Sequence, residues 1–126
     1  MIIRSLAVVL SLFVIVAIAY AHGPGGGPNG GQMQDLAGGH VELVAHDNEI
    51  AVYLFDAEDK PMSAQGIVAT ATVLSQGKQE TVNLQPADGN VMRGRGGFTA
   101  KPGLRVVLSL TLPGQRPQLG RYAPLD

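Results

Sequence analysis

Apolar and polar residues alternate along short stretches of the chain from His40 onward. Alternation with a period of two is typical of strands that bury one face, and no stretch after the leader keeps the 3.6-residue period of an amphipathic helix. Turn-forming residues separate the stretches. The pattern predicts about seven strands, the number in a single immunoglobulin-like β-sandwich, over residues 40–45, 50–55, 67–75, 78–84, 90–95, 104–112 and 119–122, with a weaker stretch at 98–100.

The first two stretches predict a hairpin whose turn is centred on Asp47 and Asn48. Register and burial agree there, because one face carries only apolar pairs: Val41 with Leu54, Leu43 with Val52 and Ala45 with Ile50. The other face is mixed, and we expect at least half of it to contact water; it carries His40 beside Phe55, Glu42 beside Tyr53 and Val44 beside Ala51.

Residues 1–21 have the pattern of a secretory signal peptide: Arg4, an apolar run, and the small residues Ala19 and Ala21 around a cleavage site. A retained membrane anchor is the alternative, but the apolar run is about 16 residues long and a spanning helix needs ~20. We therefore expect cleavage after Ala21, a periplasmic protein and no membrane anchor afterwards. The mature chain then divides into a flexible Gly/Pro-rich arm, residues 22–39, and a sandwich domain, residues 40–126.

Composition narrows the function classes. Removing Arg4 with the leader leaves eight Lys and Arg against ten Asp and Glu, which gives no electrostatic basis for binding nucleic acid. The chain has no cysteine, so a site for a soft metal would have to use methionine or histidine. It also has no nucleophile elbow, phosphate-binding loop or His-Glu-x-x-His motif, so we do not expect an enzyme.

Several segments resemble a known family: residues 38–44 (GGHVELV), 53–56 (YLFD), 59–61 (DKP) and 107–114 (VLSLTLPG). In this order they resemble small exported β-sandwich proteins found with heavy-metal efflux systems, and an N-terminal segment of some membrane-fusion subunits of those pumps. The resemblance spans residues 38–114. It implies a periplasmic location, metal handling and an efflux partner, and its Gly-Gly-His element corresponds to Gly38, Gly39 and His40.

The sharpest chemical hypothesis is a copper site at the N-terminus. Cleavage after Ala21 would make His22 the first mature residue, and its amine and Nδ1 could chelate Cu(II) together. Small periplasmic copper-resistance sandwiches use a terminal histidine this way, and this chain is similar in that respect. It departs from them because no histidine follows His46. Alternatively, His22 does not bind metal and is the first mature residue only because cleavage leaves it there.

His40 and Met33 are the other candidate ligands. His40 stands where the arm ends and could meet His22, with Met33 or Asp35 between them. His46 lies six residues further along the same strand, about 20 Å away, and is expected to be a turn residue. Met62 and Met92, the other methionines of the mature chain, have no Met-x-Met spacing and are expected to fill the core. The acidic turns at 47–49 and 56–59 do not have the ligand pattern of a calcium loop and are expected to be solvated.

These patterns predict a non-catalytic periplasmic accessory protein that binds a transition metal, with copper favoured, in metal homeostasis or efflux. The alternative is a metal-free interaction module that docks on an envelope partner through an edge strand or the face of Tyr53 and Phe55. Exposed aromatic side chains would favour that alternative, and buried ones would weaken it.

Overall fold

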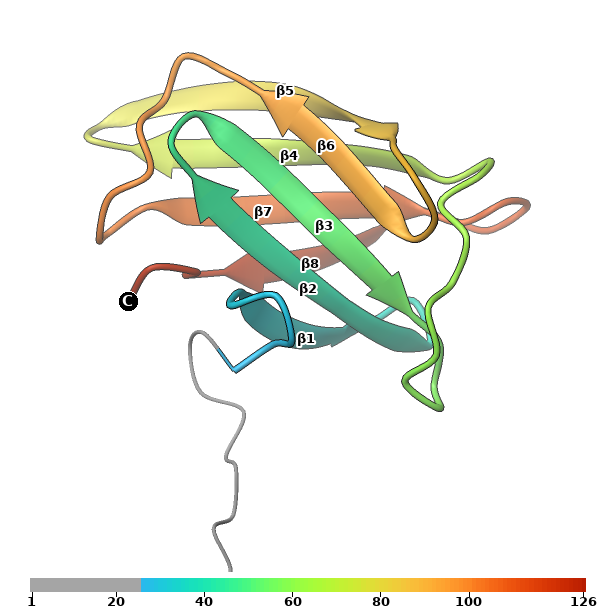
Figure 1. Cartoon of the computed structure of the whole chain (residues 1–126). Helices are drawn as coiled ribbons and strands as arrows, with labels where there is room; N and C mark the ends of the chain where they lie inside the picture. Colours follow the sequence, from blue (N-terminus) through green and yellow to red (C-terminus); the bar gives the residue numbers. More distant parts are fainter. Residues whose placement is uncertain (1–25) are drawn as a thin grey trace, which may run out of the picture.

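The computed structural model describes residues 26–126, so the predicted signal peptide and His22 lie outside the described residues. The described part is all-β, as predicted, and none of its segments is a helix that could cross a membrane. Eight antiparallel strands form it (Figure 1): β1 (Gln32–Leu36), β2 (Gly39–His46), β3 (Glu49–Phe55), β4 (Val68–Ser75), β5 (Lys78–Pro86), β6 (Val91–Arg95), β7 (Arg105–Thr111) and β8 (Gln118–Tyr122).

The strands make two layers, β1-β2-β3-β6 and β5-β4-β7-β8 (Figure 1). A short pairing of β5 with β6, at Gln85 with Arg93 and Pro86 with Met92, joins the layers into one sheet. The neighbours β3-β6 and β4-β7-β8 correspond to the B-E and C-F-G pairings of an immunoglobulin-like sandwich. The predicted sandwich is therefore confirmed, with β2 to β8 as its seven strands and β1 as an eighth.

The hairpin of β2 and β3 has the predicted register, including Val41 opposite Leu54 and His40 opposite Phe55. Asp47 turns the chain with a φ of 52°, a conformation that aspartate tolerates better than most residues. Because apolar and polar residues alternate along the strands, the apolar side chains point into the core. The largest of the fully buried apolar side chains come from both layers and the loop before β7: Leu43, Ile50, Leu54, Met92, Leu104, Leu108 and Leu110.

The predicted flexible arm is wrong over Gln32–Leu36, which form β1 and pair with β2. The apolar pattern did not reveal this strand because only Leu36 of its residues is buried. Ala37 and Gly38 connect the two strands with φ values of 56° and 77°, the conformation of a tight two-residue hairpin turn. The weaker stretch at 98–100 is not a strand, although Phe98 is buried.

Side chains, rather than a backbone ladder, connect β1 to β8. Ala123 N–H donates to Gln32 Oε1 at 2.7 Å, and the Gln34 amide donates to the Arg121 carbonyl at 3.3 Å. Below β1, the hydroxyl of buried Tyr122 donates to the Val41 carbonyl at 2.9 Å. On the β8 side, Gln118 Oε1 also accepts from Ala37 N–H at 3.2 Å. Four side chains therefore complete the barrel-like closure, and β1 is held in place from both sides.

Candidate functional site

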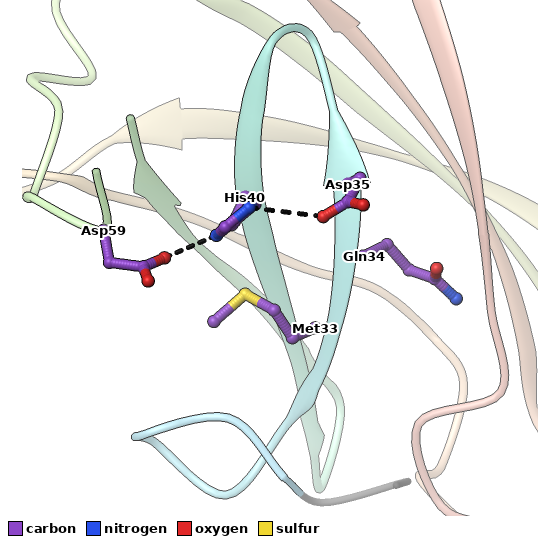
Figure 2. A pocket seen from close by; sticks show the side chains of 5 residues that line it. All are labelled: Met33, Gln34, Asp35, His40 and Asp59. Atoms are coloured by element: carbon purple, nitrogen blue, oxygen red, sulfur yellow. Dashed lines mark hydrogen bonds and ion pairs between the residues drawn. The ribbon is translucent and has the colours of Figure 1, made fainter. Parts of the chain in front are cut away.

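A pocket of about 270 Å³ opens beside the hairpin of β1 and β2 (Figure 2). Strand register explains part of its lining, since Asp35 lies directly opposite His40 and Met33 lies on the same face two residues away. Asp59 joins them from the loop after β3, because His40 is opposite Phe55, the last residue of that strand. The lining is completed by Gln34.

His40 is held at both edges of its ring. Its Nε2 lies 3.3 Å from Asp35 Oδ1, and its Nδ1 forms a short contact with Asp59 Oδ1 (Figure 2). The His40 side chain is 31% exposed, whereas the two carboxylates are largely in water. Ionised carboxylates only accept hydrogen bonds, so the contact of Nδ1 with Asp59 requires a proton on Nδ1, and a metal ion bound at Nδ1 would replace that proton. A carboxylate on the second nitrogen is also the usual support for a histidine that binds a metal.

The turn after β3 fixes the position of Asp59. The Asp56 carboxylate accepts hydrogen bonds from the N–H groups of Glu58 and Lys60, both at 2.9 Å. The backbone closes the same turn, with Asp56 N–H donating to the Lys60 carbonyl at 2.8 Å. Asp59 itself has a φ of 61°. This turn is therefore well defined by its own hydrogen bonds, and it directs Asp59 toward His40.

Met33 supplies the soft atom of the pocket. Its diagonal position relative to His40, across β1 and β2, is within reach of a long side chain. Figure 2 shows its thioether in the same space as the His40 ring and the Asp59 carboxylate. The pocket thus combines an imidazole nitrogen, a thioether sulfur and carboxylate oxygens.

In residues 26–126, no three histidine, aspartate or glutamate side chains converge as a metal-ligating group. The reason at this pocket is that Asp35 and Asp59 lie at opposite edges of one imidazole ring. An ion at Nδ1 of His40 would therefore have Asp59 and Met33 as its neighbours, with Asp35 supporting the ring from behind. Further ligands would have to come from outside this set.

The structure brings together two of the three candidate ligands, His40 and Met33, and the third, His22, lies outside the described residues. Asp59 was not recognised as a site residue, although the predicted pairing of His40 with Phe55 already implied that the next turn passes near the histidine. His46 is at the other end of β2, 3.3 Å from Asp47.

The alternative docking face gives an intermediate result, because both Tyr53 and Phe55 are half-buried. Nearby on β6, Arg93 donates a hydrogen bond to Glu49 at 3.0 Å, and this contact raises the pKa of Arg93 above its ordinary value.

Comparison with known proteins gives no significant match to any family model, curated protein or solved structure.

Proposed function

We propose that this protein is an exported, non-catalytic accessory protein that binds copper at the pocket of Met33, His40 and Asp59. The observation that carries the proposal is the meeting of His40 with a thioether and a carboxylate in one pocket. The leader-like residues 1–21 support export to the periplasm. The resemblance to efflux-associated sandwich proteins supports a role in metal homeostasis or efflux, with an envelope protein as the partner.

The types of donor favour copper over other metals. Thioether sulfur is a soft ligand that suits Cu(I), and imidazole suits both oxidation states of copper. Calcium and magnesium would instead require several oxygen ligands, and the pocket offers only two carboxylates on opposite sides of a ring. A zinc site would more often use thiolates or several histidines, but the chain has no cysteine and three histidines in all.

Solvent access fits a protein that takes up and passes on its metal. The Asp59 side chain is 71% exposed, and His40 lies at the surface between two strands and a turn. A partner could therefore approach the ion directly. This role requires only that the coordination bonds between copper and its ligands form and break reversibly, with no reaction of a substrate.

Copper titration of the mature protein, with calorimetry and a competing chelator, tests the proposal. We expect submicromolar binding, about 8 kcal/mol or more, with a loss of at least tenfold in His40→Ala and in Met33→Leu. His46→Ala is the matched control and should bind as the wild type does, because His46 lies at the far end of β2. Weak binding that is unchanged in all variants would overturn the proposal.

Failure of copper binding would favour the interaction module. Pull-down of periplasmic partners, with and without Tyr53→Ala and Phe55→Ala, would then test the aromatic face. Unchanged recovery of partners would count against that face as the docking surface.

A further inference from the structure

Glu42 is a fully buried carboxylate on the outer face of the layer formed by β1, β2, β3 and β6. Among residues 26–126 it is the only charged residue that is buried, and no Lys, Arg or His side chain in that part of the chain forms an ion pair with it. A buried carboxylate is costly unless hydrogen bonds compensate for the lost water. The residues around Glu42 must therefore supply those bonds.

The loop of residues 27–31, which leads directly into β1, covers Glu42 and supplies its hydrogen bonds. Asn29 donates from its backbone N–H to both carboxylate oxygens, at 2.9 and 3.2 Å, and from its side-chain amide at 2.9 Å. Gly31 N–H donates at 2.7 Å. The loop also closes on itself, because Gly27 N–H donates to the Gly31 carbonyl at 2.9 Å. Bonds to a charged acceptor are about twice as strong as neutral ones, so the carboxylate holds this loop against the sheet.

Glycine at two positions lets the loop lie directly on β2. A Cβ on Gly27 would be 2.3 Å from the carboxyl carbon of Glu42. A Cβ on Gly31 would be 2.4 Å from the Leu43 carbonyl oxygen and 2.7 Å from Cγ2 of Val44. A side chain at either position would push the loop away from the strand. The loop therefore lies against Val44 as well as Glu42.

Met33 shares this face with both residues that the loop contacts. Strand register places Glu42 directly opposite Met33. The diagonal neighbours of Met33 on β2 are His40 and Val44, and a long, flexible methionine side chain can reach either of them. Because the loop already occupies the side of Val44, the side of His40 is left for the thioether, and that is where Figure 2 shows it.

We propose that Glu42 is a positioning residue that directs Met33 toward His40 and thereby gives the pocket a preference for Cu(I). This inference rests on the proposed function. Thioether sulfur selects Cu(I), whereas nitrogen and oxygen ligands such as His40 and Asp59 also suit Cu(II). Without the loop, Met33 can pack on the apolar side chain of Val44, and the pocket keeps only its nitrogen and oxygen donors. The role also gives a reason for a buried carboxylate that has no basic partner.

The affinities for the two oxidation states of copper test this role. In Glu42→Gln, the carboxamide N–H₂ must face N–H donors of Asn29 or Gly31, whichever way the amide is turned, so the loop should be released. We expect Cu(I) to bind roughly tenfold more weakly or worse, the usual effect of removing a group that orients a metal ligand. Cu(II) should bind as it does to the wild type. A general loss of structure would weaken the binding of both ions.

The loss of Cu(I) affinity should depend on the Met33 thioether. Adding Glu42→Gln to Met33→Leu should weaken Cu(I) binding no further, because the thioether is already absent. Gly27→Ala should reproduce the loss in the presence of Met33, because it displaces the loop while keeping the carboxylate. It also decides the question if Glu42→Gln does not fold. Equal losses of Cu(I) affinity with and without the thioether would overturn the positioning role.

Glu80→Gln is the matched control. The two carboxylate oxygens of Glu80, on β5, share the N–H of Gly97 at 2.7 and 2.9 Å. Its replacement disturbs an equivalent contact between a carboxylate and a glycine-rich loop, away from the pocket of Met33 and His40. The affinities for Cu(I) and Cu(II) should both stay as in the wild type.

A measurement without metal separates the two proposals. We expect a nuclear Overhauser effect between the Met33 ε-methyl group and the His40 ring in the wild type and in Glu80→Gln, and its loss in Glu42→Gln. If the effect persists in Glu42→Gln, or if the affinities for Cu(I) and Cu(II) fall together, the positioning role is wrong although the proposed function stands. Loss of the effect in Glu42→Gln, with no copper binding even in the wild type, would instead overturn the proposed function and the Cu(I) preference with it.

Discussion

The hydroxyl of Tyr122, on β8, donates a hydrogen bond to the carbonyl of Val41, on β2, at 2.9 Å. This bond joins the two layers where β1 and β8 have no shared backbone ladder. Tyr122 is 2% exposed, and burial raises its pKa well above the ordinary value of about 10. Folding therefore favours the neutral phenol, which is the form that donates.

Tyr122→Phe should lower the free energy of unfolding by about 1 kcal/mol, the usual net contribution of a hydrogen bond. A raised pKa means that the contribution of the phenol is fully present below about pH 10 and is lost as the pH rises above it. Wild type should therefore lose stability between pH 9 and pH 11 more steeply than the variant. Urea unfolding across this range measures both, and parallel pH dependences would contradict the assignment.

The contribution of Asp126 to stability changes with pH in the acidic range. Arg105 Nη2 lies 2.7 Å from its carboxylate, and this contact, together with the Gly103 N–H, lowers the pKa of Asp126. Its contribution is therefore present above the ordinary pKa of about 3.9 and is lost as the pH falls below it. Asp126→Asn should make unfolding less dependent on pH between 2 and 5. An unchanged acid profile would show that this contact does not affect folding.

The sequence predicted the sandwich strands where local pattern and pairing partner agree. Val41 and Leu54 pair as expected because the alternation of both strands and the turn at Asp47 admit one register only. Strand β1 could not be predicted in this way. Its pairing depends on the free edge of β2, and its other side depends on glutamine side chains that bond to β8.

The candidate site was predicted in part for the same reason. His40 and Met33 stood out by their chemistry, since imidazole and thioether can both act as ligands of a soft or borderline metal. The contact with Asp59 depends on the shape of a turn 19 residues away, which hydrophobic pattern does not encode. The burial of Glu42 depends on the loop that covers it, and that loop has almost no side chains to reveal its position.

Gly39 is needed for close packing of β2 against β3 next to His40, whereas Gly38 is needed only for the positive φ of the turn. A Cβ on Gly39 would lie 2.1 Å from the Phe55 carbonyl oxygen, so Gly39→Ala would force β2 and β3 apart next to His40. We expect it to cost about 1–3 kcal/mol of stability, the range for overpacking. Gly38→Asn is the control, because its neighbourhood is open and asparagine tolerates a positive φ. Equal melting temperatures for both variants would contradict this packing.

Asp35 should affect copper binding without affecting stability. Its side chain is 93% exposed, and it contacts Nε2 of His40. Asp35→Asn should weaken copper binding by roughly tenfold, the lower end of the effect of removing a carboxylate behind a metal-binding histidine. The thermal midpoint should not change. Asp47→Asn makes the matching change beside His46 and should leave copper affinity as it is, so equal losses in both variants would exclude a specific role for Asp35.

The most direct test of copper binding at this pocket is the NMR signal of the methionine ε-methyl groups during titration with Cu(I). Among residues 26–126, Met33 lies in the pocket, Met92 is fully buried and Met62 packs against the core, so the signals of Met62 and Met92 are internal controls. The account predicts that the Met33 methyl signal alone shifts and saturates at one equivalent of copper, and that His40→Ala abolishes the shift. A Met33 signal that does not move, or that moves equally in His40→Ala, would contradict the account.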